Sequence, residues 1–178
     1  FSLWDTYRAA HPLYTFMHPD RMPDMVQAML AFYDQHGLLP VWPLWGNETD
    51  MMIGYHSVPV VVEAYLQGLV PAARGERILA ACVGTANRDD YRAIGLYKEL
   101  GFVPADKEGE SVSKTLEYAY DDWAIALLAQ KLGQDGIYNE FILRSKYYQN
   151  IFQPASGFMQ PRLSNGEWLP DFDPKAYT

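Results

Sequence analysis

The chain has 178 residues, of which 49% are hydrophobic and 15% aromatic, and it carries a formal net charge of −8. This length suffices for one domain with a core of its own. The acidic balance argues against a nucleic-acid partner, which would require clustered Lys and Arg. No apolar run approaches the roughly 20 residues of a membrane span, and no signal peptide or anchor is expected within these residues. The single cysteine, Cys82, permits no internal disulfide and is expected in the core.

Apolar periodicity predicts an all-α chain, with no convincing strand alternation. Helices are expected at residues 4–16, 23–36, 51–69, 73–83, 89–100, 111–132 and 136–152. Pro23 suits a first helical turn, and Gly37 and Gly133 suit C-caps. Asp135 can cap the helix that follows it.

Two segments lack helical periodicity. The proline-rich stretch 38–45 could form a short edge strand, and the residues after 153 read as turns around two short extended pieces. Helix pairs recur about every 40 residues without sequence repetition, which favours a toroid of helical hairpins over a four-helix bundle. A closed ring of six hairpins would need about twice this length. An α-solenoid is the competing architecture, and both ends of the chain suggest a piece of a longer protein.

The most informative segment runs from Glu110 to Trp123 and reads Glu-Ser-Val-Ser-Lys-Thr-Leu-Glu-Tyr-Ala-Tyr-Asp-Asp-Trp. Glu117 and Asp121 are four residues apart and share a helix face, whereas Asp122 is turned about 100° away. In a cleft, such a pair of acids would titrate abnormally or need a cation. Acids beside aromatic rings are typical of carbohydrate sites. Helix capping or pairing with an Arg would also account for them.

A second acidic cluster is Gly46-Asn-Glu-Thr-Asp50. Asn47 and Asp50 have the spacing of a capping box at the start of the next expected helix. Capping does not explain Glu48, which lies near Trp45 and precedes His56. An acid facing rings at a helix N-terminus suits the recognition of hydroxyl groups.

Asp5 and Arg8 are three residues apart on the first expected helix, so an ion pair between them is the plain structural interpretation.

The histidines show no i, i+4 ligand spacing, and a zinc site is not expected. The sequence contains no Gly-x-Ser-x-Gly elbow, Walker loop or dinucleotide fingerprint. Hydrolase triads, nucleotide use and hydride transfer therefore have no support.

Taken together, four segments in this order resemble glycoside hydrolase family 92, the calcium-dependent exo-α-mannosidases. They are Phe1-Ser-Leu-Trp-Asp-Thr-Tyr-Arg8, Gly46-Asn-Glu-Thr-Asp50 with Met52-Ile-Gly-Tyr-His56, the segment from Glu110 to Trp123, and Gly157-Phe-Met159. The resemblance extends to the Phe-Asp-Pro segment that ends at Pro174, and so covers the whole chain.

The resemblance implies an (α/α)6 barrel of which residues 1–178 are about half, as a single partial domain. The N-terminal β-sandwich and the rest of the barrel are expected to be absent. It also implies calcium, inversion at the anomeric carbon, and release of terminal mannose from α-mannosides such as N-glycan ends. Inversion needs an acid and a base about 6.5–9.5 Å apart. The family resemblance further implies a secreted, periplasmic or cell-surface protein.

By position, Asp5 matches the family's aspartate that grips the terminal mannose, and the acids at 47–50 and 117–122 match acids around the inner helices. The expected substrate-binding residues are Asp5, Arg8, Trp45, Glu48, Asp50, His56, Glu117 and Asp121. No metal ligand is assigned within the chain, since the main Ca²⁺ ligands are expected outside it. The family's general acid and base follow the Phe-Asp-Pro segment, beyond Thr178, so the isolated chain is expected to be inactive.

The expected partners are an α-mannoside oligosaccharide and the remainder of the same catalytic domain. Two alternatives stay open at this point. One is an (α/α)6 glycosidase with another sugar preference, which a comparison of glucosides with mannosides would separate. The other is a non-catalytic helical interaction domain, in which the acids form solvated faces and the aromatic residues form the core.

Overall fold

The structure, a computed structural model, describes residues 2–175; Phe1 of the first family motif and residues 176–178 lie outside the described part. The prediction of an all-α chain is confirmed. The helices are α1 (Leu3–Thr6), α2 (Ala10–Met17), α3 (Met22–His36), α4 (Ser57–Leu66), α5 (Gly75–Ala86), α6 (Ile94–Leu100), α7 (Ser111–Lys131) and α8 (Asp135–Arg144), with 3-10 turns η1 (Ala72–Arg74) and η2 (Tyr147–Ile151).

Strand structure in residues 2–175 is limited to two small antiparallel hairpins and one isolated bridge. β1 (Pro43–Leu44) pairs with β2 (Asn47–Glu48), with Pro43 opposite Glu48. β3 (Phe152–Gln153) pairs with β4 (Phe158–Met159), with Phe152 opposite Met159. The bridge joins Arg162 to Trp168. β1 lies in the stretch where the sequence suggested an edge strand, and β4 and the bridge lie in the expected turn-rich tail. β2 lies beyond the first of these stretches, and β3 begins within the expected helix 136–152.

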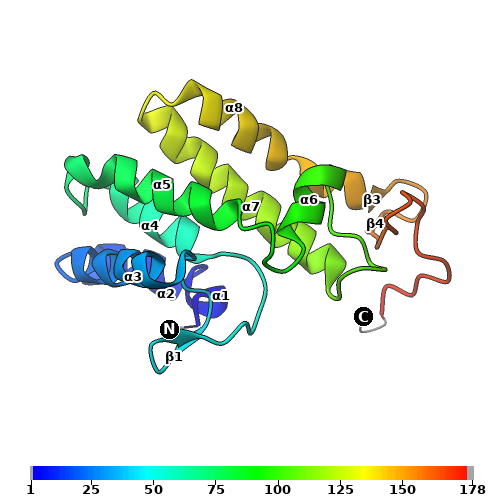
Figure 1. Cartoon of the computed structure of the whole chain (residues 1–178), viewed down its shortest axis with the longest axis horizontal. Helices are drawn as coiled ribbons and strands as arrows, with labels where there is room; N and C mark the ends of the chain where they lie inside the picture. Colours follow the sequence, from blue (N-terminus) through cyan, green and yellow to red (C-terminus); the bar gives the residue numbers. More distant parts are fainter. Residues whose placement is uncertain (1, 176–178) are drawn as a thin grey trace.

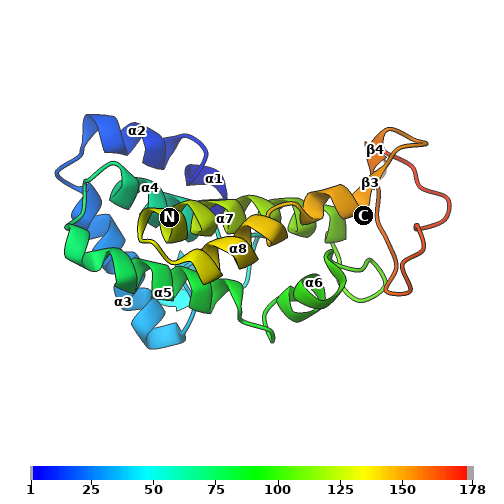
Figure 2. The same ribbon diagram turned by 90° about the horizontal axis from the view of Figure 1, so that it is seen from above.

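The principal helices form two layers of three (Figures 1 and 2). One layer contains α2, α4 and α7, and we call it the inner layer because it would line the interior of a ring of hairpins. The outer layer contains α3, α5 and α8, which follow the inner helices one by one along the chain and run back in the opposite direction (Figure 1). The arrangement is thus three successive helical hairpins, which agrees with a partial all-α barrel.

The core lies between these two layers. Its largest fully buried side chains include Tyr55, Tyr97, Tyr118 and Phe141. The central position of α4 follows from its sequence, Ser-Val-Pro-Val-Val-Val-Glu-Ala-Tyr-Leu, which is apolar on nearly all sides and has seven buried residues. Among residues 2–175, none of the helices combines the length and the apolar character needed to cross a membrane.

The expected helix 4–16 is wrong in one respect, because a turn at residues 7–9 divides it into α1 and α2. Pro12 explains the break, since its ring would clash with the carbonyl group of Arg8 in a continuous helix. Ala9 accordingly leaves the helical region, with φ −148° and ψ −58°.

The expected helices 51–69 and 89–100 begin too early. In the structure these helices start at Ser57 and Ile94. Asp50 and Met52 before α4, and Ala93 before α6, have positive φ values of 54°, 66° and 59°. A right-handed helix cannot pass through such residues.

The other helices differ at their ends. Helix 73–83 begins as η1 and continues to Ala86, and helix 136–152 ends at Arg144 before η2. The positions of Pro23, in the first turn of α3, and of Gly37, in the left-handed conformation after it, are confirmed. Gly133 is also left-handed just beyond α7. Asp135 is the first residue of α8, and Gln134 takes the N-cap position without a side-chain hydrogen bond.

Candidate functional site

The residues expected to bind a sugar lie toward one end of the inner layer but do not share one cavity. Arg8 lines one cavity, whereas Glu48 and Asp50 line another. Asp5 and Arg8 precede α2; Trp45, Glu48, Asp50 and His56 precede α4; and Glu117 and Asp121 lie in the first half and the middle of α7. Since α2, α4 and α7 run in the same direction (Figure 1), the segments before them meet at the same end of the molecule. Two long connections at this end shape its surface. We call them loops; they are 37–56, which contains the β1–β2 hairpin, and 87–110, which contains α6.

Backbone strain concentrates in these two loops. Among the described residues, the non-glycine residues with positive φ are Trp45, Asp50, Met52, Arg92, Ala93, Glu110 and Asp171. All except Asp171 lie in the two loops or at the start of α7. Each such conformation costs about 1–3 kcal/mol, and these conformations gather at functional sites. The strain therefore marks the same end of the inner layer.

At this end, a buried histidine is held between two carboxylates of α7. His56 is fully buried; its Nδ1 lies 2.7 Å from Oδ1 of Asp121, and its Nε2 binds Oε2 of Glu117. Carboxylates in this pairing accept hydrogen bonds, so both ring nitrogens must donate and the ring is an imidazolium. The sequence predicted that Glu117 and Asp121 could need a cation between them. The imidazolium of His56 is that cation.

The pKa values of this group follow from its surroundings. Burial alone would lower the pKa of His56, but the charge and hydrogen bond of Asp121, and then those of Glu117, raise it to about 9. Burial raises the pKa of Asp121, and the nearby His56 opposes that rise. The side chain of Glu117 is 18% exposed, so it is the member of the group that reaches the surface.

Two neighbours confine the imidazole ring. The ring of Tyr7 stacks on it, with centroids 3.9 Å apart and planes inclined by 11°. Gly54 lies so close that a Cβ atom there would come within 2.4 Å of Nε2 of His56, and its φ of +77° also favours glycine. Burial, followed by the charge of Glu117, raises the pKa of Tyr7 to about 12. We call His56, Glu117, Asp121 and Tyr7 the His56 cluster.

A cavity of about 650 Å³ opens between the three inner helices. Its lining includes Tyr7 and Arg8 before α2, Glu63 on α4, and Tyr120 and Trp123 on α7. Tyr120 and Trp123 are 42% and 45% exposed, and their ring centroids lie 6.2 Å apart. Exposed ring faces with a few charged groups suit a hydroxyl-rich ligand that has apolar C–H faces.

Asp122 belongs to a separate, buried group on the outer side of α7. Its Oδ2 lies 3.0 Å from Nε of Arg144 and its Oδ1 3.1 Å from Nη2, and the hydroxyls of Tyr55 and Tyr97 donate to it at 2.6 and 3.0 Å. Burial raises the pKa of Asp122 to about 6, against the opposing charge of Arg144. The alternative of pairing with an Arg is therefore correct for this acid.

The sequence pattern did not reveal the partners of Asp122. Arg144 lies one helix later, and nothing in its local sequence distinguishes it from an exposed arginine in a last helical turn. Tyr55 and Tyr97 gave no signal beyond their apolar surroundings. Tyr7 was also missed, although it lies between two expected site residues, Asp5 and Arg8.

The cluster at 47–50 has a different role from the expected capping box. The helix begins only at Ser57, so that prediction is wrong. The Glu48 carboxylate instead accepts hydrogen bonds from the backbone N–H groups of Val41, at 2.6 Å, and Trp42, at 2.9 Å, and stabilises the β1–β2 hairpin. Trp45, in the hairpin turn, is 92% exposed, and Asp50 is exposed.

The expected ion pair between Asp5 and Arg8 is absent from the ion pairs of the described residues, because α1 ends at Thr6 and the helical spacing is lost. The Arg8 guanidinium donates to the carbonyl oxygen of Trp4 at 3.3 Å and lies 4.8 Å from the ring centroid of Tyr7. Asp5 is exposed. Its carboxylate is therefore accessible to a ligand.

Within residues 2–175, no group of three or more His, Cys, Asp or Glu side chains could hold a metal ion. The buried acids Asp121 and Asp122 are committed to His56 and Arg144. Glu48 is committed to backbone donors. Among residues 2–175, these three acids are therefore bound to protein groups.

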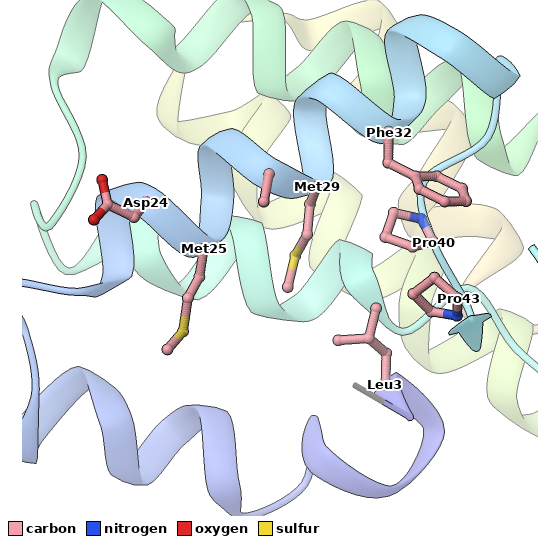
Figure 3. A pocket seen from close by; sticks show the side chains of 8 residues that line it. Leu3, Asp24, Met25, Met29, Phe32, Pro40 and Pro43 are labelled. Atoms are coloured by element: carbon pink, nitrogen blue, oxygen red, sulfur yellow. The ribbon is translucent and has the colours of Figure 1, made fainter. Parts of the chain in front are cut away.

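A second cavity, of about 370 Å³, differs in chemistry (Figure 3). Leu3, Met25, Met29, Phe32 and two prolines line it, with Asp24 as the one charged residue among those that line it. Figure 3 shows these side chains between α1, α3 and the proline-rich loop. Such an apolar groove offers little to a hydroxyl-rich ligand, so the cavity of the inner layer is the better candidate.

Comparison with known proteins agrees with this arrangement. The family model described as "Glycosyl hydrolase family 92 catalytic domain" matches residues 1–178. A solved family GH92 α-mannosidase from Bacteroides thetaiotaomicron is 44% identical, with a TM-score of 0.95, over 99% of this chain and 24% of its own length. A further structure of that protein is a complex with mannoimidazole.

Two other relatives are more distant. A family GH92 inverting mannosidase from Bacteroides thetaiotaomicron is 32% identical, with a TM-score of 0.91, over 99% of this chain and 25% of its own length. A protein of Arthroderma benhamiae named "Uncharacterized secreted glycosidase" is 25% identical over 91% of this chain and 24% of its own length. The chain thus spans about a quarter of the length of these relatives.

Proposed function

Because the chain belongs to glycosyl hydrolase family 92, as its motifs predicted, we propose that it supplies part of the site of an exo-α-mannosidase. In the complete protein, this enzyme removes terminal α-linked mannose from N-glycans or mannans with inversion at the anomeric carbon. Its preferred substrates include α-1,2-linked mannosides. Glycosidase family membership and the α-mannosidase structures with the same fold support this reaction class.

The observation that carries the proposal is the cavity of the inner layer. It brings exposed rings of Tyr120 and Trp123 together with the charged groups of Arg8 and Glu63. The rings stack on the C–H faces of sugar units, and the charged groups exchange hydrogen bonds with hydroxyls. The mannoimidazole complex of the related enzyme supports a mannoside as the ligand.

Asp5, in α1 just before Tyr7 and Arg8, accepts hydrogen bonds from hydroxyls of the terminal mannose. Its exposure supports this role. Glu48 acts indirectly, since it stabilises the hairpin that presents Trp45 and leads to Asp50. The general acid and base lie outside this chain, and the isolated chain is therefore inactive.

Calcium dependence is part of the proposal, but the acids of residues 2–175 do not form a site for the ion. When bound, calcium supplies charge that orients hydroxyls of the sugar. Its ligands come from outside this chain. The contribution of this chain is to bind and orient the mannoside through the groups described above.

We place the enzyme outside the cell or in the periplasm, or at the cell surface. The name of the Arthroderma relative, a secreted glycosidase, supports an exported protein.

The proposal is tested by incubating the complete protein with matched α-mannosides and α-glucosides, beside the isolated chain of residues 1–178. We expect mannose release by the complete protein alone. Turnover confined to glucosides would favour the glycosidase of other specificity. Turnover by the isolated chain would contradict the placement of the acid and base.

A further inference from the structure

The His56 cluster contains one more negative than positive charge, with the Arg8 guanidinium nearby over the Tyr7 ring, and its geometry indicates which carboxylate can meet a ligand. Two carboxylates face one imidazolium. Asp121 is fully buried and also accepts the backbone N–H of Tyr55 at 2.7 Å, so both of its oxygens are bound. Glu117 is the partly exposed member and uses Oε2 for His56. Its Oε1 is therefore the atom of the cluster best placed to meet a ligand.

We propose that His56 is a positioning residue, which fixes the Glu117 carboxylate and the Tyr7 ring as one rigid wall of the mannoside site. In this arrangement, Oε1 of Glu117 accepts a hydrogen bond from a sugar hydroxyl. The proposal rests on the proposed function for the identity of the ligand. His56 itself does not touch the sugar, because it is fully buried.

The surroundings of His56 suit this role. A glutamate on a helix surface samples several rotamers, and a ligand that needs one of them must restrict the rest. The hydrogen bond from Nε2 of His56 restricts Glu117 before the ligand arrives. The imidazole itself cannot turn easily, since Asp121 holds Nδ1, the Tyr7 ring covers one face and Gly54 lies against it.

The same contacts also connect the wall to the cavity of the inner layer. Tyr7 stacks on His56 and lines that cavity, and its ring centroid lies 5.6 Å from that of Tyr120. A displacement of His56 would therefore move both a hydrogen-bonding group and a stacking surface. Losses of this kind reduce binding and alignment of a substrate while most of the fold remains.

The experiment is a double-mutant cycle in the complete protein with His56→Asn and Glu117→Gln. An asparagine amide can replace Nδ1 in the bond to Asp121 but is too short to reach Glu117, so the fold should be retained. The exposed His18 gives the matched control His18→Asn. Thermal unfolding is measured for every variant, so that loss of folded protein is separated from loss of function.

We expect His56→Asn and Glu117→Gln each to lower kcat/KM for an α-mannoside about ten- to a hundred-fold, chiefly through KM. The double variant should be no more than about two-fold worse than Glu117→Gln, because both changes remove the same interaction. His18→Asn should match the unmodified protein. The proposal would be overturned if the losses of the two single variants multiplied in the double variant. It would also be overturned if His56→Asn left kcat/KM unchanged.

A crystal structure of the His56→Asn variant tests the positioning without any turnover. The Glu117 and Tyr7 side chains should leave their original rotamers while Asp121 keeps its contact with Tyr55. If Glu117 and Tyr7 stay in place, His56 is not what positions them. If this movement occurs but the unmodified protein releases no mannose, the proposed function fails and the positioning role stands.

Discussion

Asp121 and Asp122 are adjacent in α7, yet their carboxylates bind different partners on two sides of the helix. Asp121 holds His56 and the backbone N–H of Tyr55, whereas Asp122 holds Arg144 and the hydroxyl of Tyr55. The segment before α4 is thus fastened to α7 at two points. One point faces the candidate sugar site and the other faces the outer layer, so the same pair of residues links the site to the fold.

The ion pair of Asp122 with Arg144 should be essential for stability. Asp122→Ala leaves the Arg144 guanidinium, which is 4% exposed, without its buried counter-charge, and only the half-exposed Glu140 remains as an acidic partner. The free energy of unfolding is expected to fall by about 3–5 kcal/mol, as for other broken buried pairs. Urea unfolding measures the change. The exposed pair of Asp34 with Arg77 provides the control, since Asp34→Ala should cost less than about 1 kcal/mol. Equal costs for the two variants would contradict this role.

The pKa of His56 predicts how stability depends on pH. Its folded-state pKa of about 9 lies above the ordinary value of 6.5. The stabilisation of the folded state by protonated His56 is therefore fully present below about pH 6.5. It is lost as the pH rises to about 9, which lowers the free energy of unfolding by up to about 3 kcal/mol. Tyr7, with a pKa raised to about 12, stays protonated over this interval. Urea unfolding between pH 6 and 9.5 should show the decline, and His56→Asn should flatten it. An equal decline in the variant would assign it to other groups.

Gly54 should be intolerant of a side chain because of its contact with His56. Both Gly54 and Gly68 have positive φ, of +77° and +74°, but a Cβ at Gly68 would meet no atom within 4 Å. Gly68→Ala should therefore cost about 1 kcal/mol from the backbone alone. Gly54→Ala should cost about 1–3 kcal/mol more, because the His56 ring must shift. Thermal unfolding compares the two, and equal costs would show that the contact is unimportant.

Asp5→Ala in the complete protein tests the predicted contact with the terminal mannose. Loss of a hydrogen bond to a charged group should lower kcat/KM about ten- to a hundred-fold. Stability should hardly change, because Asp5 is exposed and absent from the ion pairs described for residues 2–175. Asp20→Ala is the matched control on another exposed acid. Unchanged mannoside turnover in Asp5→Ala would refute the role.

Local sequence patterns predicted a helix well where its hydrophobic periodicity was clear. The expected helix 111–132 agrees with α7, Ser111–Lys131, and the separation of Glu117 and Asp121 from Asp122 follows from helical geometry alone. The expected helix 51–69 failed at its start, where Met52 and Gly54 adopt left-handed conformations. The same segment is also held by a contact with a distant residue. Asp121 binds the backbone of Tyr55 across 66 positions of the chain.

The candidate site was predictable only in part, for a similar reason. The motifs pointed to His56 and Glu117 separately, but their contact joins residues 61 positions apart. The stacking of Tyr7 on His56 depends on the turn that Pro12 imposes between α1 and α2. No local periodicity carries such information, since these contacts arise from the packing of the inner helices.

The most direct test of the account is anomer-resolved NMR of α-1,2-mannobiose incubated with the complete protein, with calcium and then with excess chelator. We expect β-mannose to appear first, the chelator to stop its release, and added calcium to restore it. Initial release of α-mannose would contradict inversion. Release that is unaffected by the chelator would contradict the dependence on calcium, and no release at all would contradict the assignment of an α-mannosidase.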